Sequence, residues 1–123
     1  MHCPTARELS QKKCRPCEGG VAPMSAEQAK EYAKVLEGWQ LSPDGKAISK
    51  TYVMKGFAEA VQLINRICDV AEAEDHHPDL HLTGYRKLMI ELSTHAIKGL
   101  SENDFILASK IESLPKELKS FSR

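Results

Sequence analysis

The sequence predicts an α+β fold, a four-stranded antiparallel sheet with three helices packed on one face, in the order α-β-β-α-β-β-α. Three observations favour it. Apolar and polar residues alternate around residues 47–54 and 85–93, as is typical of half-buried strands. Between these segments, apolar residues recur at helical spacing over residues 57 to about 75. Strands that follow one another in the sequence are joined by short links, which favours antiparallel neighbours.

The N-terminal part of the chain differs from the rest. The chain has 123 residues, which fits one domain with a single core. Residues 1–23 mix Pro, Gly, Cys and basic residues without a sustained apolar period. We therefore expect residues 1–23 to be a loosely ordered, Cys-containing extension, and residues 24–123 to be the folded domain.

The predicted domain opens with a helix and a hairpin. Ser25 can cap a helix over residues 26–38, Gln28 completes a capping box, and Gly38 closes the helix. Trp39 begins a short strand. The SPDG turn at residues 42–45 connects that strand to a second one within residues 47–54.

The longest predicted helix covers residues 57 to about 75. Its apolar stripe consists of Phe57, Val61, Ile64, Cys68 and Ala71, widened by Ala60 and Ile67. Pro78 cannot continue this helix, because its ring removes a backbone donor and restricts His77 before it. The His76-His77 pair should therefore lie at the C-terminus of the helix.

The last predicted elements are two strands and a helix. A short segment over residues 80–83 precedes a strand over residues 85–93, in which Leu88, Ile90 and Leu92 share a face. A final helix begins at Ser101 and fades near residue 115. Ser101 and Asp104 fit a capping box, with Asp104 in the place of the usual Glu or Gln.

The overall charge argues against several classes of partner. Lys plus Arg number 17 and Asp plus Glu number 17, so no net field would hold the protein on nucleic acid or on an acidic membrane surface. No apolar run approaches the roughly 20 residues needed to cross a bilayer, and the N-terminus lacks an apolar segment of the secretory kind. We expect a cytoplasmic protein with reduced thiols, without direct nucleic acid or membrane partners.

The stretch EAEDHHPDLH, residues 72–81, carries the most distinctive chemistry. Glu72 and His76 are four apart and would share one side of a helix, where the carboxylate favours a charged imidazolium. His77 would point about 100 degrees away. His95 follows a strand and can project towards the same helix end. Three imidazoles would then converge on one cleft, and imidazole suits proton transfer at neutral pH.

Other interpretations of these residues are open. Histidines at a helix end can be simple dipole partners, and Asp104 can serve only as a cap. A zinc site using His76, His77, His81 or His95 is disfavoured, because adjacent histidines are poorly placed to chelate one ion. Cys3, Cys14 and Cys17 are a second candidate metal set, and Cys14 and Cys17 form a CxxC motif. The usual zinc pattern has two such pairs, so we expect no metal.

The spacing of these residues resembles the signature of the pterin-4a-carbinolamine dehydratase family. Glu72 is followed after three residues by His76-His77-Pro78, after six more by Tyr85, after nine more by His95, and after eight more by Asp104. The resemblance covers roughly residues 25–115. The family's fold, three helices on one face of a four-stranded antiparallel sheet, agrees with the order of elements predicted above.

The resemblance implies a specific enzyme, a 4a-hydroxytetrahydrobiopterin dehydratase. Such an enzyme removes water from the 4a-hydroxy pterin released by aromatic amino acid hydroxylases, and it needs no metal or organic cofactor. The family's catalytic histidines correspond to His76, His77 and His95. We hypothesise that His76, charged through Glu72, assists departure of the hydroxyl group. His95 would handle the proton on the ring nitrogen, and His77 would mainly hold the pterin.

The resemblance also suggests supporting residues and partners. The supporting residues are Glu72, Asp79, Leu80, Tyr85 and Asp104. Many relatives have tryptophan where this chain has Leu80, so we expect a less aromatic wall beside the pterin. Family members form dimers and tetramers, and an exposed sheet edge favours pairing of subunits, so we expect a homodimer or homotetramer. The alternative function is a non-catalytic binding module, either a dimerisation cofactor or an assembly chaperone.

Overall fold

The computed structural model describes residues 4–14 and 22–120. The helices are α1 (Ala6–Gln11), α2 (Ala26–Lys34), α3 (Phe57–Glu74) and α4 (Glu102–Glu112), with a short 3-10 helix η1 (His95–Ile97). The strands are β1 (Gln40–Leu41), β2 (Ile48–Val53), β3 (Asp79–Thr83) and β4 (Lys87–Leu92). The predicted order runs from α2 to α4, with α1 added before it and η1 between β4 and α4.

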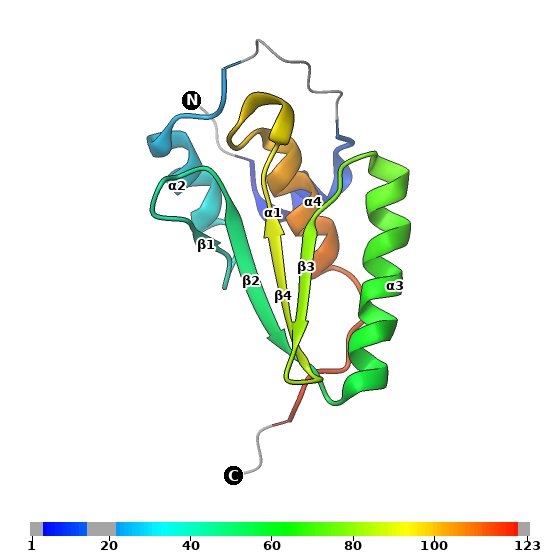
Figure 1. Ribbon diagram of the computed structural model, residues 1–123. Coiled ribbons are helices and arrows are strands. Elements are labelled where there is room, and N and C mark those ends of the chain that lie inside the picture. The colour runs from blue at the N-terminus through cyan, green and yellow to red at the C-terminus, as the bar shows by residue number, and fades with distance from the viewer. Residues whose placement is uncertain (1–3, 15–21, 121–123) are drawn as a thin grey trace.

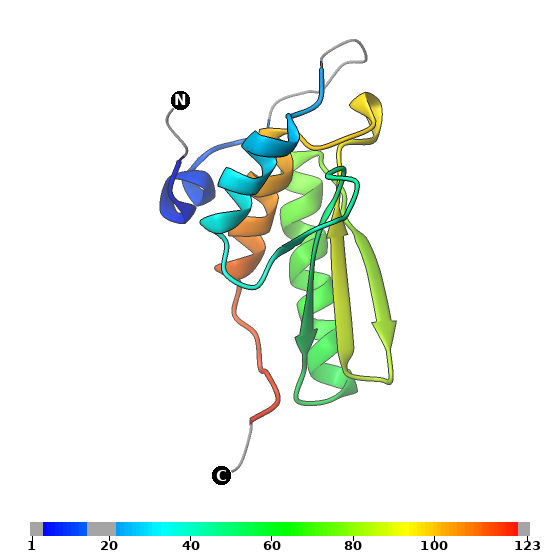
Figure 2. The same cartoon turned by 90° about the vertical axis from the view of Figure 1, so that its left-hand side faces the viewer.

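The four strands form one antiparallel sheet in the order β1-β2-β4-β3. Helices α2, α3 and α4 lie on the same face of this sheet (Figures 1 and 2), which confirms the predicted α+β fold. In the register of the central pair, Ile48 lies opposite Leu92 and Val53 opposite Lys87. Strand β3 pairs with β4 alone, so it forms one edge of the sheet.

The core lies between the sheet and the helices. Leu88, Ile90 and Leu92 of β4 are all fully buried, as their alternation predicts. Helix α4 is buried around most of its circumference, because it packs against α3 and, on another side, against α1. This central position gives α4 side chains access to both ends of the molecule.

Helix α3 turns only part of the predicted stripe inward. Its buried residues are Ala60, Leu63, Ile67 and Ala71, with Ile64 half-buried. Phe57 is 58% exposed and Val61 and Cys68 are also exposed, so the prediction that these three face the core was wrong. The helix carries two apolar stripes with the same spacing, and docking against the sheet selects between them.

The N-terminal segment is more structured than the sequence predicts. Residues 6–11 form α1, where no element was expected. A capping box starts it: Thr5 N–H donates to Glu8 at 3.0 Å, and Glu8 N–H donates to the Thr5 hydroxyl at 3.2 Å. Leu9 is fully buried in the main core, and α1 lies on the side of α4 away from the sheet (Figure 2). A helix of six residues is too short for periodicity to reveal it.

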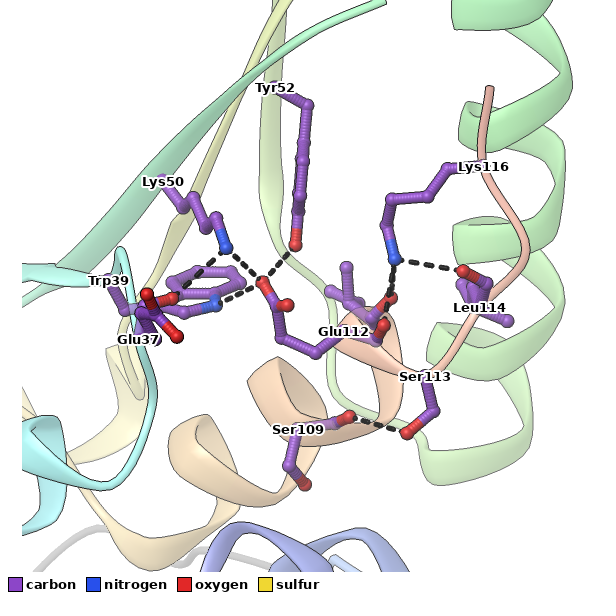
Figure 3. A network of polar contacts seen from close by, with 10 residues as sticks. Glu37, Trp39, Lys50, Tyr52, Ser109, Glu112, Ser113, Leu114 and Lys116 are labelled. Carbon is purple, nitrogen blue, oxygen red and sulfur yellow. Dashed lines mark hydrogen bonds and ion pairs between the residues drawn. The ribbon is translucent and has the colours of Figure 1, made fainter. Parts of the chain in front are cut away.

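A polar cluster joins β2, the segment before β1 and the C-terminal end of α4 (Figure 3). Trp39 Nε1 and Lys50 Nζ donate to Glu112 Oε1 at 3.0 and 2.6 Å, and the Tyr52 hydroxyl donates to the same oxygen. We call these four residues the Glu112 cluster. Lys116 Nζ donates to the carbonyl oxygens of Ile111, Glu112 and Leu114 and so caps the end of α4.

Among the described residues, no helix is both long and apolar enough to cross a membrane. The predicted cytoplasmic location stays a prediction.

Candidate active site

A pocket of about 610 Å³ opens where α3 ends, β3 begins and η1 follows β4. These element ends lie together at the top of the ribbon in Figure 1. Residues lining it include Cys14, His76, His77, Asp79, Thr94 and His95. The three histidines that the sequence singles out therefore do meet at one cavity. They come from two segments of the chain, the end of α3 and the turn after β4.

The end of α3 differs from the prediction in a way that changes the histidine partners. The helix ends at Glu74, and Asp75 adopts the left-handed conformation with φ of 51°. Asp tolerates this conformation better than most side chains, and a left-handed residue commonly closes a helix. His76 therefore lies outside the helix. The predicted Glu72–His76 pair does not form, because the helical four-residue spacing no longer applies.

His76 pairs instead with Asp104 of α4. Its Nε2 lies 2.7 Å from Asp104 Oδ1, and the two side chains are 11% and 0% exposed. The second carboxylate oxygen accepts hydrogen bonds from Ser101 N–H at 3.0 Å and from the Thr94 hydroxyl at 2.8 Å. An ionised carboxylate only accepts, so Nε2 carries the proton of the His76 contact. Asp104 thus caps α4, as predicted, and also orients His76.

His77 makes the exposed counterpart of this contact. Its Nε2 lies 2.5 Å from Glu72 Oε2, and the two side chains are 56% and 69% exposed. The turn at Asp75 brings His77 rather than His76 back to Glu72. Because solvent screens this pair, the contact restrains the His77 ring more weakly than Asp104 restrains His76.

His95 is held by its neighbour Thr94. Thr94 is buried, and its backbone exchanges hydrogen bonds with Gly99, from Thr94 N–H to Gly99 O at 2.8 Å and back at 3.4 Å. This bridge closes the turn that contains η1 and places the exposed His95 side chain at the pocket. Within residues 4–14 and 22–120, the His95 imidazole has no carboxylate partner.

The remaining predicted residues fall into two groups. Asp79, at the start of β3, lines the pocket. Leu80 does not: it is half-buried and packs against the core, because alternation along β3 turns it to the opposite side from Asp79. Tyr85 lies in the turn between β3 and β4, at the far end of this hairpin, exposed and stacked near the Arg86 guanidinium. The structure therefore places neither Leu80 nor Tyr85 at the pocket.

Two features of the pocket had no signal in the sequence. Thr94 is a buried donor to Asp104, yet it follows no motif of its own. Cys14 lines the pocket although it belongs to the segment expected to be loosely ordered. Both depend on contacts between parts of the chain that are distant in sequence or joined by an irregular turn.

The geometry of Cys14 bears on the zinc alternative. Burial and the neighbouring Glu74 carboxylate raise the pKa of its thiol to about 12, which disfavours the thiolate that zinc binds. Cys3 and Cys17 lie outside the described residues. Across the part of the chain that the structure describes, no group of three or more His, Cys, Asp and Glu side chains is placed to hold a metal ion.

Comparison with known proteins gives a consistent result. The family described as Pterin 4 alpha carbinolamine dehydratase matches residues 22–114. A protein of Halorhodospira halophila, whose name assigns it provisionally to the pterin-4-alpha-carbinolamine dehydratases, is 45% identical over 86% of this chain and 96% of its own length. The Arabidopsis thaliana protein named pterin-4-alpha-carbinolamine dehydratase 2, mitochondrial, is 42% identical over 89% of this chain and 60% of its own length.

A solved structure shares the fold. The crystal structure titled transcriptional coactivator/pterin dehydratase from Brucella melitensis superposes with a TM-score of 0.69 at 27% sequence identity. The match covers 74% of this chain and 96% of that one.

Proposed function

The chain belongs to the pterin-4a-carbinolamine dehydratase family, and from this premise we propose that it removes water from a 4a-hydroxytetrahydropterin to give the quinonoid dihydropterin. It is an enzyme of the hydro-lyase class. The observation that carries the proposal is the pocket on which three imidazoles converge, one of them bound to a fully buried carboxylate.

The reaction requires two proton movements. The bond between C4a and its hydroxyl oxygen breaks, and a proton delivered to that oxygen lets it leave as water. The ring nitrogen next to C4a loses its proton, and the electron pair of that N–H bond forms the new C=N bond. Positioned imidazoles can perform both transfers at neutral pH, and each such transfer typically contributes about 10²- to 10⁴-fold in rate.

We assign the proton delivery to His76. Asp104 holds Nε2, which leaves Nδ1 as the nitrogen that can give a proton to the departing hydroxyl group. The Asp104 carboxylate orients the His76 ring, and its own position is fixed by hydrogen bonds from Thr94 and Ser101. Asp104 thereby takes the role that the sequence suggested for Glu72.

His95 and His77 complete the assignment. His95 lines the pocket with an exposed imidazole, and we assign it the opposite task of accepting the ring-nitrogen proton. His77 lies at the pocket rim with Glu72 and would hold the pterin. Asp79 supports binding from the adjacent strand.

A direct assay tests this function. Purified protein is mixed with freshly generated 4a-hydroxytetrahydropterin, and the quinonoid product is followed by its absorbance against the spontaneous rate. We expect clear acceleration that saturates with substrate. A rate equal to the spontaneous one would reject the proposed activity.

The proposed cellular role follows from the product. Quinonoid dihydropterin is the form that is reduced and used again, so the activity would recycle the pterin of an aromatic amino acid hydroxylase. Deleting the gene in a cell that contains such a hydroxylase should lower the sustained rate of hydroxylation. An unchanged rate, with the dehydratase assay positive, would separate the enzyme from this role.

A protein-binding function is the second candidate. The Brucella melitensis structure is titled both coactivator and dehydratase. In this chain, α3 exposes Phe57 and Val61, and β3 is a sheet edge, so the surface offers both a helix and a strand for association.

We propose that the protein forms a homodimer or a homotetramer. Light scattering at micromolar concentration tests this oligomeric state, and a monomer would reject it.

A further inference from the structure

Residues 5–14, which we call the N-terminal strap, pack against the domain and form hydrogen bonds with it at several positions. Leu9 is fully buried in the core. Lys110 of α4 donates from Nζ to Ser10 O at 2.9 Å, and Lys12 Nζ lies 3.0 Å from Glu102 Oε1. The strap is therefore held both by the buried Leu9 side chain and by polar contacts with α4.

The strap ends in the wall of the catalytic pocket. Cys14 N–H donates to Glu74 Oε1 at 2.7 Å, and its thiol donates to Asn103 O at 3.6 Å. Both Cys14 and Asn103 line the same pocket as the three histidines. The strap therefore contacts the end of α3, which His76 follows, and the start of α4, which carries Asp104.

Glu74 is the point where the strap meets the catalytic segment. It is the last residue of α3, two positions before His76, and its side chain is 8% exposed. One carboxylate oxygen accepts from Cys14, and the other lies 3.9 Å from Lys110 Nζ, which also holds Ser10 of the strap. Fixing Glu74 from two sides restrains the turn at Asp75 that directs His76.

We propose that the N-terminal strap is a working part of the active site, in which Glu74 is a positioning residue for His76 and Cys14 is a specificity-determining residue that limits the size of the bound pterin. This inference rests on the proposed function. The strap precedes the residues matched by the family, which begin at residue 22.

The character of the Cys14 side chain suits a wall rather than a reactive group. Burial and the Glu74 carboxylate raise the pKa of the thiol to about 12, so it stays neutral at the pH of the cell. A small neutral side chain excludes water from one side of a bound ring without adding charge. A bulkier residue at this position would intrude into the space that the substrate needs.

Protection of the thiol from alkylation by a bound pterin tests whether Cys14 lies beside the substrate. In the full chain with C3S, C17S and C68S, Cys14 is the single thiol and is alkylated slowly with N-ethylmaleimide at pH 9, followed by mass spectrometry. With 7,8-dihydrobiopterin at ten times its Kd, we expect labelling to slow by about tenfold, since only unoccupied protein reacts. The control carries C3S, C14S and C17S and leaves Cys68, exposed on α3, where labelling should not change.

The binding of 7,8-dihydrobiopterin is measured separately by fluorescence titration. Unchanged labelling of Cys14 by a protein that binds this pterin would overturn the inference and leave the proposed function in place. Failure to bind it at all would count against the proposed function, and the inference would fall with it.

Steady-state kinetics separate the two roles. Cys14→Leu should raise KM by about tenfold with little change in kcat, as expected when a pocket loses room for a substrate of the same shape. Cys68→Leu, exposed on α3, is the matched control and should match the parent. Glu74→Ala should lower kcat by roughly threefold to tenfold without raising KM, the range for one lost hydrogen bond, and Glu74→Gln should recover part of it. Parental kinetics in both Cys14→Leu and Glu74→Ala would overturn the inference.

Discussion

Helix α4 carries Asp104 near its start and Glu112 at its end, and each carboxylate accepts several hydrogen bonds from other segments. The two networks lie at opposite ends of the helix and differ in the groups that donate to them. Asp104 contacts His76, Thr94 and Ser101. Glu112 contacts Trp39, Lys50 and Tyr52 (Figure 3). The partners of Glu112 are an indole, a lysine and a phenol, whereas one partner of Asp104 is an imidazole that lines a pocket.

This difference shows that a carboxylate in a tight polar network is not by itself a functional site. Burial raises the pKa of Tyr52, and the Glu112 carboxylate raises it further. Burial of Glu112 raises its own pKa, but hydrogen bonds from Lys50 and Tyr52 outweigh that effect and lower it. Such shifts arise in structural networks as well as in active sites. The partner group and the open cavity distinguish Asp104 from Glu112.

Replacing the catalytic histidines should cause the largest loss of turnover. His76→Ala and His95→Ala should each lower turnover by roughly 10²-fold or more, the usual cost of a lost acid or base. His81→Ala is the matched control, because His81 is exposed on β3 and is not among the pocket residues. Stopped-flow measurement of quinonoid product would check this. Near-parental turnover in both the His76 and His95 variants would sink the assignment of their roles.

Exchanging Asp104 and Glu112 in turn for their amides compares the two networks directly. Asp104→Asn should lower kcat by about tenfold to 100-fold, comparable to the loss of an orienting carboxylate beside a histidine in other sites. Glu112→Gln should leave kcat and KM near the parental values and lower the melting temperature instead. Kinetics and thermal unfolding are measured on the same samples. Equal losses of activity in the two variants would mean that the two ends of α4 do not differ as described.

The pH dependence of stability should follow the Glu112 cluster. The pKa of Glu112 is lowered from its ordinary 4.5, so its contribution to stability is present above that pH and is lost as the pH falls below it. The pKa of Tyr52 is raised from its ordinary 10.0, so its contribution is present below that pH and is lost as the pH rises through the folded value.

The test is thermal unfolding of variants across this range. Tyr52→Phe should cost about 1 kcal/mol at neutral pH and flatten the alkaline decline. Glu112→Gln should flatten the acidic decline. Unfolding curves whose pH dependence is unaltered in both variants would contradict this account of the cluster.

The exposed pair at the pocket rim should give the smallest effect. Glu72→Gln removes the carboxylate beside His77, and exposed ion pairs are worth about 0–1 kcal/mol. We expect kcat/KM to fall by no more than roughly fivefold, with kcat almost unchanged. A loss as large as that of Asp104→Asn would show that Glu72, as first predicted from the sequence, governs the catalytic histidine.

Local patterns in the sequence predicted some features of the fold and the site but not others. The alternation of Leu88, Ile90 and Leu92 and the capping box at Ser101 predicted β4 and the start of α4, because both patterns arise from contacts close along the chain. The identity of the three histidines was also predicted, and the structure brings all three to one pocket. The predicted pairing of Glu72 with His76 was wrong, because a single left-handed residue, Asp75, turns His77 rather than His76 towards Glu72.

The sequence alone determined the order of elements from α2 to α4 apart from η1, the family and the set of histidines, since these depend on local periodicity and on the spacing of residue types. Only the tertiary structure decided that Asp104 rather than Glu72 holds His76, that α3 buries Leu63 rather than Phe57, and that Cys14 reaches the pocket. Each of these depends on how separate segments dock. Docking minimises exposed apolar area and unpaired buried polar groups over the whole molecule. A local sequence pattern does not specify these contacts between distant segments.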